Sequence, residues 1–251
     1  MSGTDSNCFL FAGPTLYGVD GDLPAGGVNV LPPAGRGDVE RLVASRPPGV
    51  VAIADGVFHH RLAVGHAEIR AAVEAGWDVW GLSSMGAIRA FEMRGMGVRG
   101  YGRVYRCFFE HEDFRDDEVA LVHEPAPPYR ALTEPLVHTR SWLGGLVRRR
   151  VLSKVQEARA LERLTSVWYG ERSLAFVREV VAGVAPARTA AIEAALGDFG
   201  RHRLKSLDLS NFLRERPWSA PREGLTPAGR SSASARRRAG RSEARRTPVR
   251  S

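Results

Sequence analysis

The chain has 251 residues, enough for one sizeable core with an appendage or for two small domains. An apolar fraction of 43% and a charged fraction of 25% are typical of an ordinary globular protein. No uninterrupted apolar run approaches the ~20 residues of a membrane span, and residues 1–7 lack the pattern of a signal peptide. Cys8 and Cys107 are too few for a disulfide framework, and we expect both to be buried thiols. These features favour a cytoplasmic protein without a membrane partner.

The formal net charge of +8 is concentrated at the end of the chain. Residues 219–251 hold nine arginines and two glutamates, which gives +7 there and leaves +1 for everything before. This segment has almost no large apolar residue, so we predict a disordered basic tail. Loose attraction to an acidic partner or to nucleic acid is the alternative. No aromatic residue lies between the arginines to stack on bases, so we do not expect nucleic acid as a partner.

Short apolar runs alternate with helical patterns in the first half of the chain. The predicted strands cover residues 8–12, 28–31, 50–54 and 77–82, and the predicted helices start at Asp38 and cover 62–75 and 85–93. Strands that alternate with helices over short connections form parallel sheets with right-handed crossovers. We therefore predict an α/β fold with a small parallel Rossmann-like (flavodoxin-like) sheet.

The pattern changes beyond residue 100. An aromatic cluster, an acidic run and a proline-rich linker are followed by helices over 133–212, broken at residues 170, 183–186 and 197–200. We predict an α/β core domain over 1–124, a helical region over 125–218 and the basic tail over 219–251.

Three polar or flexible segments follow predicted strands directly. Gly13, Asp55 and Ser84 each lie just beyond such a strand. Because ligands of open parallel sheets bind outside the carboxyl ends of the strands, we expect these residues to share one edge.

The run from Trp77 to Glu92 is the most informative stretch. It reads as a strand, a Ser83-Ser84 turn and a helix, which is how a serine hydroxyl is displayed on a strained turn in hydrolases. The match to the G-x-S-x-G pattern is partial, because Leu82 stands where a small residue is required for Ser84. Two interpretations stay open: Ser84 is a nucleophile, or a serine merely caps the helix.

Histidines and an acid accompany that serine. His66 shares a predicted helix face with Leu62 and Ile69, so it is either a half-buried core histidine or a general base for Ser84. Asp55 forms a turn, orients His66 or binds a substrate amine. The adjacent His59 and His60 are weak indications of a metal site.

Arg89 and Glu92 lie three residues apart on one predicted helix. They form an intrahelical pair, or Arg89 clamps a carboxylate or another anion if that face borders the site.

Other motifs are less informative. Residues 95–100 match G-x-G-x-x-G but follow a helix, so we interpret them as a helix stop and loop, and no phosphate-binding P-loop is present. The acidic residues of 111–118 resemble a magnesium site in composition, but we interpret them as a solvated loop. We predict neither a metal nor a cofactor.

Taken together, several motifs resemble those of the TfuA-like proteins. The resemblance covers about residues 8–140 and rests on Phe11-Ala12-Gly13-Pro14-Thr15, residues 33–38, Asp55-Gly56-Val57-Phe58-His59, His66-x-Glu68-Ile69, Ser84-Met85-Gly86-Ala87-x-Arg89-Ala90-x-Glu92, residues 116–120 and Tyr129-Arg130. Each piece is weak and the combination is specific. Leu82-Ser83 is a departure, and the helical half matches more loosely.

The resemblance implies an accessory protein that acts with a YcaO enzyme in antibiotic-type peptide biosynthesis. The YcaO partner activates a backbone amide of a ribosomally made peptide with ATP, and sulfur replaces the amide oxygen. The accessory protein is expected to enhance its partner or to deliver sulfide, for example by hydrolysing a thiocarboxylated sulfur-carrier protein. The alternative is a non-catalytic adaptor that docks on the YcaO enzyme.

Carried over by position, the family pattern marks Asp55, His66, Ser84, Arg89 and Glu92. In the enzymatic hypothesis Ser84 attacks the thioacyl carbon or positions water, His66 is the base and Asp55 orients it. Arg89, Glu92, Gly13 and His59 are the predicted substrate-binding residues.

Overall fold

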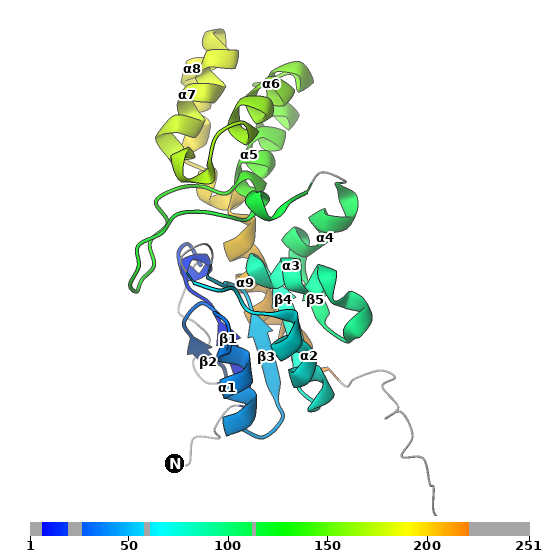
Figure 1. The fold of residues 1–251 in the computed structure, drawn as a ribbon. Coiled ribbons are helices and arrows are strands. Elements are labelled where there is room, and N and C mark those ends of the chain that lie inside the picture. The colour runs from blue at the N-terminus through cyan, green and yellow to red at the C-terminus, as the bar shows by residue number, and fades with distance from the viewer. Residues whose placement is uncertain (1–6, 20–26, 58–60, 112–113, 221–251) are drawn as a thin grey trace, which may run out of the picture. The chain divides into compact units, whose positions relative to one another are not determined.

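The computed structural model describes residues 7–19, 27–57, 61–111 and 114–220. Its sheet contains β1 (Cys8–Phe11), β2 (Asn29–Leu31), β3 (Val50–Ile53), β4 (Asp78–Leu82) and β5 (Arg99–Tyr101). All neighbouring strands are parallel, and their order is β2-β1-β3-β4-β5 (Figure 1). This is the flavodoxin-like order, in which the direction of winding reverses between β1 and β3. The predicted fold class is confirmed.

The fifth strand is a correction to the sequence prediction. Residues 95–100 were expected to form only a helix stop and loop, but β5 begins at Arg99, separated by two residues from a short 3-10 helix, Arg94–Met96. β5 forms by pairing with β4 at the edge of the sheet: Arg99, Gly100 and Tyr101 lie opposite Trp80, Gly81 and Leu82. With three residues and a central glycine, β5 carries no apolar run that periodicity can detect.

Side chains alternate between the two faces of the sheet. Phe9, Val51 and Val79 point to one face and pack with residues of α1 (Asp38–Ser45), α2 (His66–Glu74) and α3 (Met85–Glu92). Leu10, Ala52 and Trp80 point to the other face. Because both faces are buried, these strands are apolar throughout rather than alternating.

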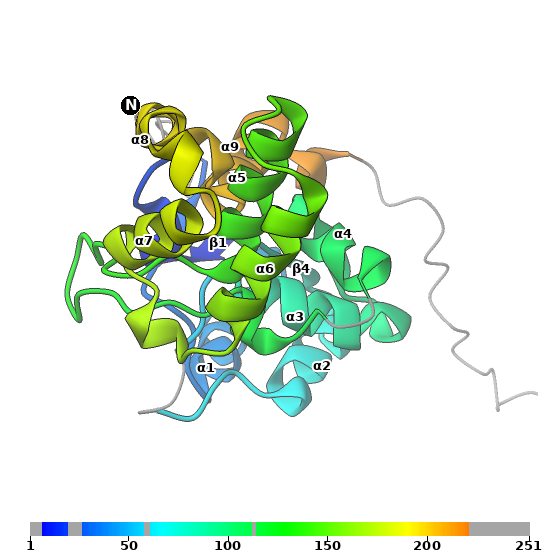
Figure 2. The same ribbon diagram turned by 90° about the horizontal axis from the view of Figure 1, so that it is seen from above.

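The second face is covered by α9 (Leu204–Glu215), which comes from the far end of the chain. Leu209, Phe212 and Leu213 of this helix pack on the sheet in one core cluster. Figure 2 shows α9, in orange, on the side opposite to α1 and α2. The helix thereby brings residues near 205 to the carboxyl ends of strands that lie more than 100 positions earlier.

The start of α2 differs from the prediction. The helix begins at His66 rather than at residue 62, and Leu62 is 69% exposed instead of sharing the inner face. Glu68 fixes this start, because its carboxylate accepts a hydrogen bond from the Gly65 N–H at 2.7 Å. His66 is consequently in the first turn, where it is partly exposed.

The predicted helical C-terminal region is present. It contains α5 (Leu136–Arg148), α6 (Lys154–Thr165), α7 (Leu174–Val184) and α8 (Thr189–Leu196), after α4 (Gly102–Glu110). A separate core, with Trp142 and Phe199 near its centre, holds α5 to α8 together. The predicted breaks at residues 170, 183–186 and 197–200 lie at helix ends, whereas the turn after Arg148 was not predicted.

The described residues up to Trp218 form one compact unit. The predicted basic tail lies outside the described residues apart from its first two positions. The predicted boundary between residues 124 and 125 stays a prediction. In the described part of the chain, every helix falls short of the combination of length and apolar character needed to cross a membrane.

The approach of α3 to the sheet is close at two glycines. A Cβ atom on Gly86 would lie 1.6 Å from the carbonyl oxygen of Ile53, and one on Gly81 would lie 2.0 Å from the carbonyl oxygen of Gly86. Both neighbours are backbone atoms that a rotamer change cannot move. Only glycine therefore lets α3 begin this close to β3 and β4.

We predict that Gly86→Ala lowers the free energy of unfolding by at least about 2 kcal/mol, because the helix must move away from β3. Gly183→Ala is the matched control, since a Cβ atom there has no neighbour within 4 Å. The control should leave stability unchanged or raise it by up to about 1 kcal/mol through helix propensity. Urea denaturation of both variants measures the difference, and equal stabilities would contradict the prediction.

Candidate functional site

A cavity of about 280 Å³ lies where β1, β3 and β4 end. We call it the strand-end cavity. It is located at the reversal of strand order between β1 and β3, which is where open parallel sheets bind their ligands. Prolines and aliphatic residues form much of its wall, and its polar lining residues are Asp55, Arg61, Ser84, His123, Tyr129, Tyr169 and Lys205.

Asp55 lies at the inner wall of this cavity and is 1% exposed. One carboxylate oxygen accepts hydrogen bonds from the N–H groups of Gly13 and Thr15, at 2.8 and 2.9 Å. The other accepts one from the Thr15 hydroxyl at 2.6 Å. Asp55 thus ties the segment after β1 to the end of β3, and this is also where the structure places the predicted residue Gly13.

The Ser83-Ser84 turn displays one hydroxyl and buries the other. Ser83 has a φ of 63°, which is unusual for a residue other than glycine, and its hydroxyl donates to the carbonyl of Lys205 at 2.9 Å. Ser84 occupies the N-cap position of α3 but makes no side-chain capping bond. Among the hydrogen bonds of the described residues, none involves the Ser84 hydroxyl, and Ser84 lines the cavity. The capping interpretation therefore does not account for its hydroxyl.

His66, Arg89 and Glu92 form a separate cluster. The Nε2 atom of His66 lies 2.8 Å from a carboxylate oxygen of Glu92, and the Arg89 guanidinium donates to the same oxygen at 2.7 Å. Arg89 also donates to the carbonyl of Val64 at 3.0 Å. These three residues are not among those that line the strand-end cavity. The structure therefore places Asp55 and Ser84 at one cavity. His66, the predicted base, is not among the residues that line it and pairs with Glu92 instead.

Asp116 adjoins this cluster electrostatically. Burial raises the pKa of its carboxyl above the ordinary value, the charge of Glu92 raises it further, and the Arg89 guanidinium opposes both. The predicted intrahelical pair of Arg89 and Glu92 is present. His59, also predicted to bind substrate, lies outside the described residues, as does His60.

Lys205 is the main residue that the sequence prediction missed. It is in the first turn of α9, 2% exposed, and its Nζ atom donates to the carbonyl of Val119 at 3.0 Å. Within the described ranges, no carboxylate lies within 4.0 Å of this ammonium group. Burial lowers the pKa of Lys205, and the charges of Asp55 and Glu134 oppose that shift.

A signal for Lys205 exists in the sequence. The chain has 36 basic residues, yet only Lys154 and Lys205 are lysines. Lys154 is exposed and pairs with Glu157. A lysine in a chain that otherwise uses arginine is informative, since an arginine cannot lose its proton in a protein.

A buried polar group supports the backbone of Lys205. His138 lies with its Nδ1 atom 3.0 Å from Glu134, and its Nε2 atom accepts the Lys205 N–H at 3.3 Å. This arrangement requires the neutral imidazole with the proton on Nδ1. Burial lowers the pKa of His138 to about 4 against the opposing effect of Glu134. Arg203 also donates to Glu134, so that acid is fully engaged.

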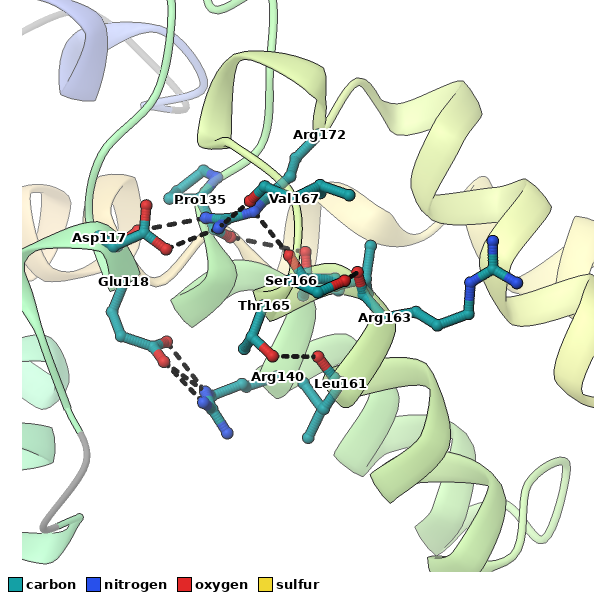
Figure 3. A network of polar contacts seen from close by, with 12 residues as sticks. Asp117, Glu118, Pro135, Arg140, Leu161, Arg163, Thr165, Ser166, Val167 and Arg172 are labelled. Atoms are coloured by element: carbon teal, nitrogen blue, oxygen red, sulfur yellow. Dashed lines mark hydrogen bonds and ion pairs between the residues drawn. The ribbon is translucent and has the colours of Figure 1, made fainter.

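The acidic run 116–118 joins the sheet domain to the helical region. Asp117 accepts a hydrogen bond of 2.6 Å from the buried Arg172, and Glu118 accepts three hydrogen bonds of 2.6–2.9 Å from Arg140 (Figure 3). Arg172 also donates to the carbonyls of Leu164 and Val167. Glu118 is 3% exposed, so the interpretation of this run as a solvated loop is wrong for it. The carboxylates of Asp117 and Glu118 link this run to Arg172 and Arg140 of the helical region.

One group of potential metal ligands is present at the end of α4. Donor atoms of Cys107, Glu110 and His111 lie within 4.8 Å of one another. Cys107 is half-buried rather than buried as predicted, and burial raises the pKa of its thiol to about 11. The strand-end cavity is lined by other residues, and burial favours the protonated thiol of Cys107.

The fold and the cavity together define an α/β protein with a polar site at the switch point of a flavodoxin-like sheet. Residues 55–173 match the model of the TfuA-like protein family. Over these residues the chain is TfuA-like, and the family predicted from the motifs is confirmed. The match begins at residue 55, so the motifs at residues 11–15 and 33–38 lie outside it, and it extends further into the helical region than the resemblance over residues 8–140 indicated. A search of curated proteins found no match.

We predict that His138 makes the stability of the protein fall in mild acid. Its pKa is about 4 in the folded protein, against an ordinary value of 6.5, so between these pH values the unfolded chain binds a proton that the folded one does not. Stability should therefore fall as the pH drops from about 6.5 to about 4, by on the order of 3 kcal/mol.

The measurement is urea denaturation across that pH range. His138→Gln should flatten the dependence, whereas the control His111→Gln, which changes an exposed histidine, should keep it. An unchanged slope in the His138 variant would show that another group is responsible.

Proposed function

We propose that this TfuA-like protein is the accessory protein of a YcaO enzyme in backbone thioamide formation on a ribosomally made peptide. In this proposal it releases sulfide by hydrolysing a thiocarboxylated carrier protein in the cytoplasm. The match to the TfuA-like family supports the partnership. The strand-end cavity supports the hydrolytic step.

One observation carries the hydrolytic proposal: the Ser84 hydroxyl lines the cavity without engaging another described residue. In the described residues no buried side-chain oxygen lacks a hydrogen-bond partner, so the Ser84 oxygen is accessible to a ligand in the cavity. The preceding residue, Ser83, has left-handed backbone geometry, and strained residues cluster at sites where a reactive group is displayed.

The start of α3 supplies the second requirement of acyl transfer. At the start of α3 the Gly86 N–H donates to the Ala54 carbonyl and the Ala87 N–H to the Ser84 carbonyl. Among the described backbone hydrogen bonds, the N–H group of Met85, next to Ser84, is left without an acceptor. Such donors stabilise the oxyanion of a tetrahedral intermediate. In the proposed reaction, Ser84 attacks the thioacyl carbon, the Met85 N–H donates to the carbonyl oxygen and the sulfur leaves.

The other predicted residues take supporting roles in this proposal. Asp55 shapes the cavity by holding the segment after β1, because the described hydrogen bonds of its carboxylate come from Gly13 and Thr15. His66, Arg89 and Glu92 provide a polar surface outside the cavity for the carrier protein or the YcaO enzyme. The base that activates Ser84 is then a residue of the cavity itself.

A non-catalytic adaptor is the second candidate. The helical region exposes large apolar side chains, among them Trp168 at 59% and Val155 at 62%, which a bound partner would cover. In that case the protein binds the YcaO enzyme and shapes its site without chemistry of its own.

The test uses purified protein and a thiocarboxylated carrier, with no YcaO enzyme present. We predict that the wild type releases sulfide and that Ser84→Ala releases it at least about 100-fold more slowly. The matched control is Ser45→Ala, which removes a hydroxyl that does not line the cavity. That hydroxyl donates to the Leu42 carbonyl, so the control should lose at most about 1 kcal/mol of stability but keep its rate within a few-fold.

Full sulfide release by Ser84→Ala would overturn the hydrolytic role. Tight binding of the wild type to the YcaO enzyme, without any sulfide release, would favour the adaptor.

A further inference from the structure

The end of α4 brings a thiol, a carboxyl group and an imidazole together. Cys107, Glu110 and His111 each offer one donor atom, and these three atoms lie within 4.8 Å of one another. The residues follow the i, i+3, i+4 spacing that places side chains on one face of a helix. The His111 N–H donates to the Cys107 carbonyl at 3.1 Å, which closes the last turn and keeps the imidazole one turn beyond the thiol.

Two of these three side chains have no other polar partner in the described part of the chain. Neither the Glu110 carboxylate nor the His111 imidazole forms a hydrogen bond or an ion pair with a described residue. The His111 ring stacks loosely on that of Phe114, with centroids 6.3 Å apart and planes inclined by 23°. Glu110 and His111 are exposed, so both side chains can turn toward a ligand without disturbing the core.

The charges around the thiol attract a cation. The carboxylates of Glu110, Asp208 and Glu118 act on Cys107 through space, against the one guanidinium of Arg103. Asp208 and Glu118 already accept hydrogen bonds from fixed donors on α4 and α5. Glu110 is therefore the acid that is able to bind an ion together with the thiol, and the other two add negative charge nearby.

The donor set determines which ion fits. One thiolate, one imidazole and one carboxylate oxygen are donors that Zn²⁺ takes in proteins, whereas Mg²⁺ and Ca²⁺ take oxygen donors. Around a tetrahedral Zn²⁺ the donor atoms are about 3.5 Å apart, so the three groups need to approach one another by only about 1 Å. This set shares only His111 with the acidic run 111–118, whose composition resembled a magnesium site.

We propose that Cys107, Glu110 and His111 form a zinc site at the end of α4, with water in the fourth position of the ion. On binding, the Cys107 thiol gives its proton to the solvent and a sulfur electron pair to the ion, so no oxidant or reductant takes part. Glu110 binds as the carboxylate and His111 as the neutral imidazole. The site shares no residue with the strand-end cavity, so the inference does not depend on the proposed hydrolysis.

The binding test uses full-length protein that has been stripped of metal, and Zn²⁺ in competition with a coloured chelator. The wild type should bind one Zn²⁺ tightly. Loss of a group that only supports a metal ligand weakens binding 10–100-fold, so Cys107→Ala and His111→Gln, which remove ligands, should weaken it at least about 10-fold. The matched control is Cys8→Ala, which removes the other thiol of the chain and should keep the affinity.

Equal affinity of the wild type and Cys107→Ala for Zn²⁺ would overturn the inference. His111→Gln changes an exposed side chain, so its result stands even if Cys107→Ala folds poorly. The pH measurements on His138 use metal-free protein, in which His111 is an ordinary exposed histidine and a valid control.

A spectroscopic measurement on the wild type identifies the thiolate ligand directly. Co²⁺ occupies the tetrahedral sites of Zn²⁺ and gives a charge-transfer band in the near ultraviolet when a thiolate binds it. The band should appear in the wild type and in Cys8→Ala and should be absent from Cys107→Ala. A wild type without the band, or a band that persists in Cys107→Ala, would overturn the inference.

Thermal unfolding supplies a third readout. Because an ion that binds only the folded chain stabilises it, Zn²⁺ should raise the melting temperature of the wild type and of Cys8→Ala. The same addition should leave the melting temperature of Cys107→Ala unchanged. An equal rise in all three proteins would place the bound zinc elsewhere and overturn the inference.

Discussion

The contact of α3 with the backbone of β3 and β4 is the constraint on which the site depends. Gly81 and Gly86 carry no Cβ atom at this contact, so the first turn of α3 packs directly against the backbone of the sheet. Ser84, just before the helix, is thereby placed beside the end of β3, where Asp55 binds the segment after β1. The ends of β1, β3 and β4 form one wall of the cavity for two reasons. The backbone of α3 contacts that of the sheet, and the Asp55 carboxylate accepts three hydrogen bonds. These backbone contacts and hydrogen bonds position the polar groups of the cavity.

The sheet was predictable because its strands are buried on both faces. Val50–Ile53 and Asp78–Leu82 stand out as apolar runs between helical patterns, and the short connections between them imply parallel strands. The edge strand β5 has no such signal. The start of α2 was not predictable from periodicity alone. The hydrogen bond between Glu68 and the Gly65 N–H places it at His66.

The site was predictable to the extent that it follows strands. Asp55 and Ser84 lie directly after β3 and β4, so topology places both at one cavity. His66 follows a loop, and its side chain pairs with Glu92 on α3, a contact that depends on how two helices lie beside each other. Lys205 is more than 100 residues from Ser84 in sequence. Only the packing of Leu209 and Phe212 on the second face brings it there, and no spacing rule describes that return.

Charge gives the cavity its chemical character. Asp55, Glu134 and Glu118 are buried acids, and each accepts all its hydrogen bonds from fixed donors, including Arg203 and Arg140. A structure that commits its acids to arginines and backbone N–H groups leaves a buried lysine without direct compensation. Burial then favours the neutral amine, whereas a single carboxylate within 4 Å would favour the ammonium form. Arginines thus hold the acids, and Lys205 stays buried with its ammonium group on the carbonyl of Val119.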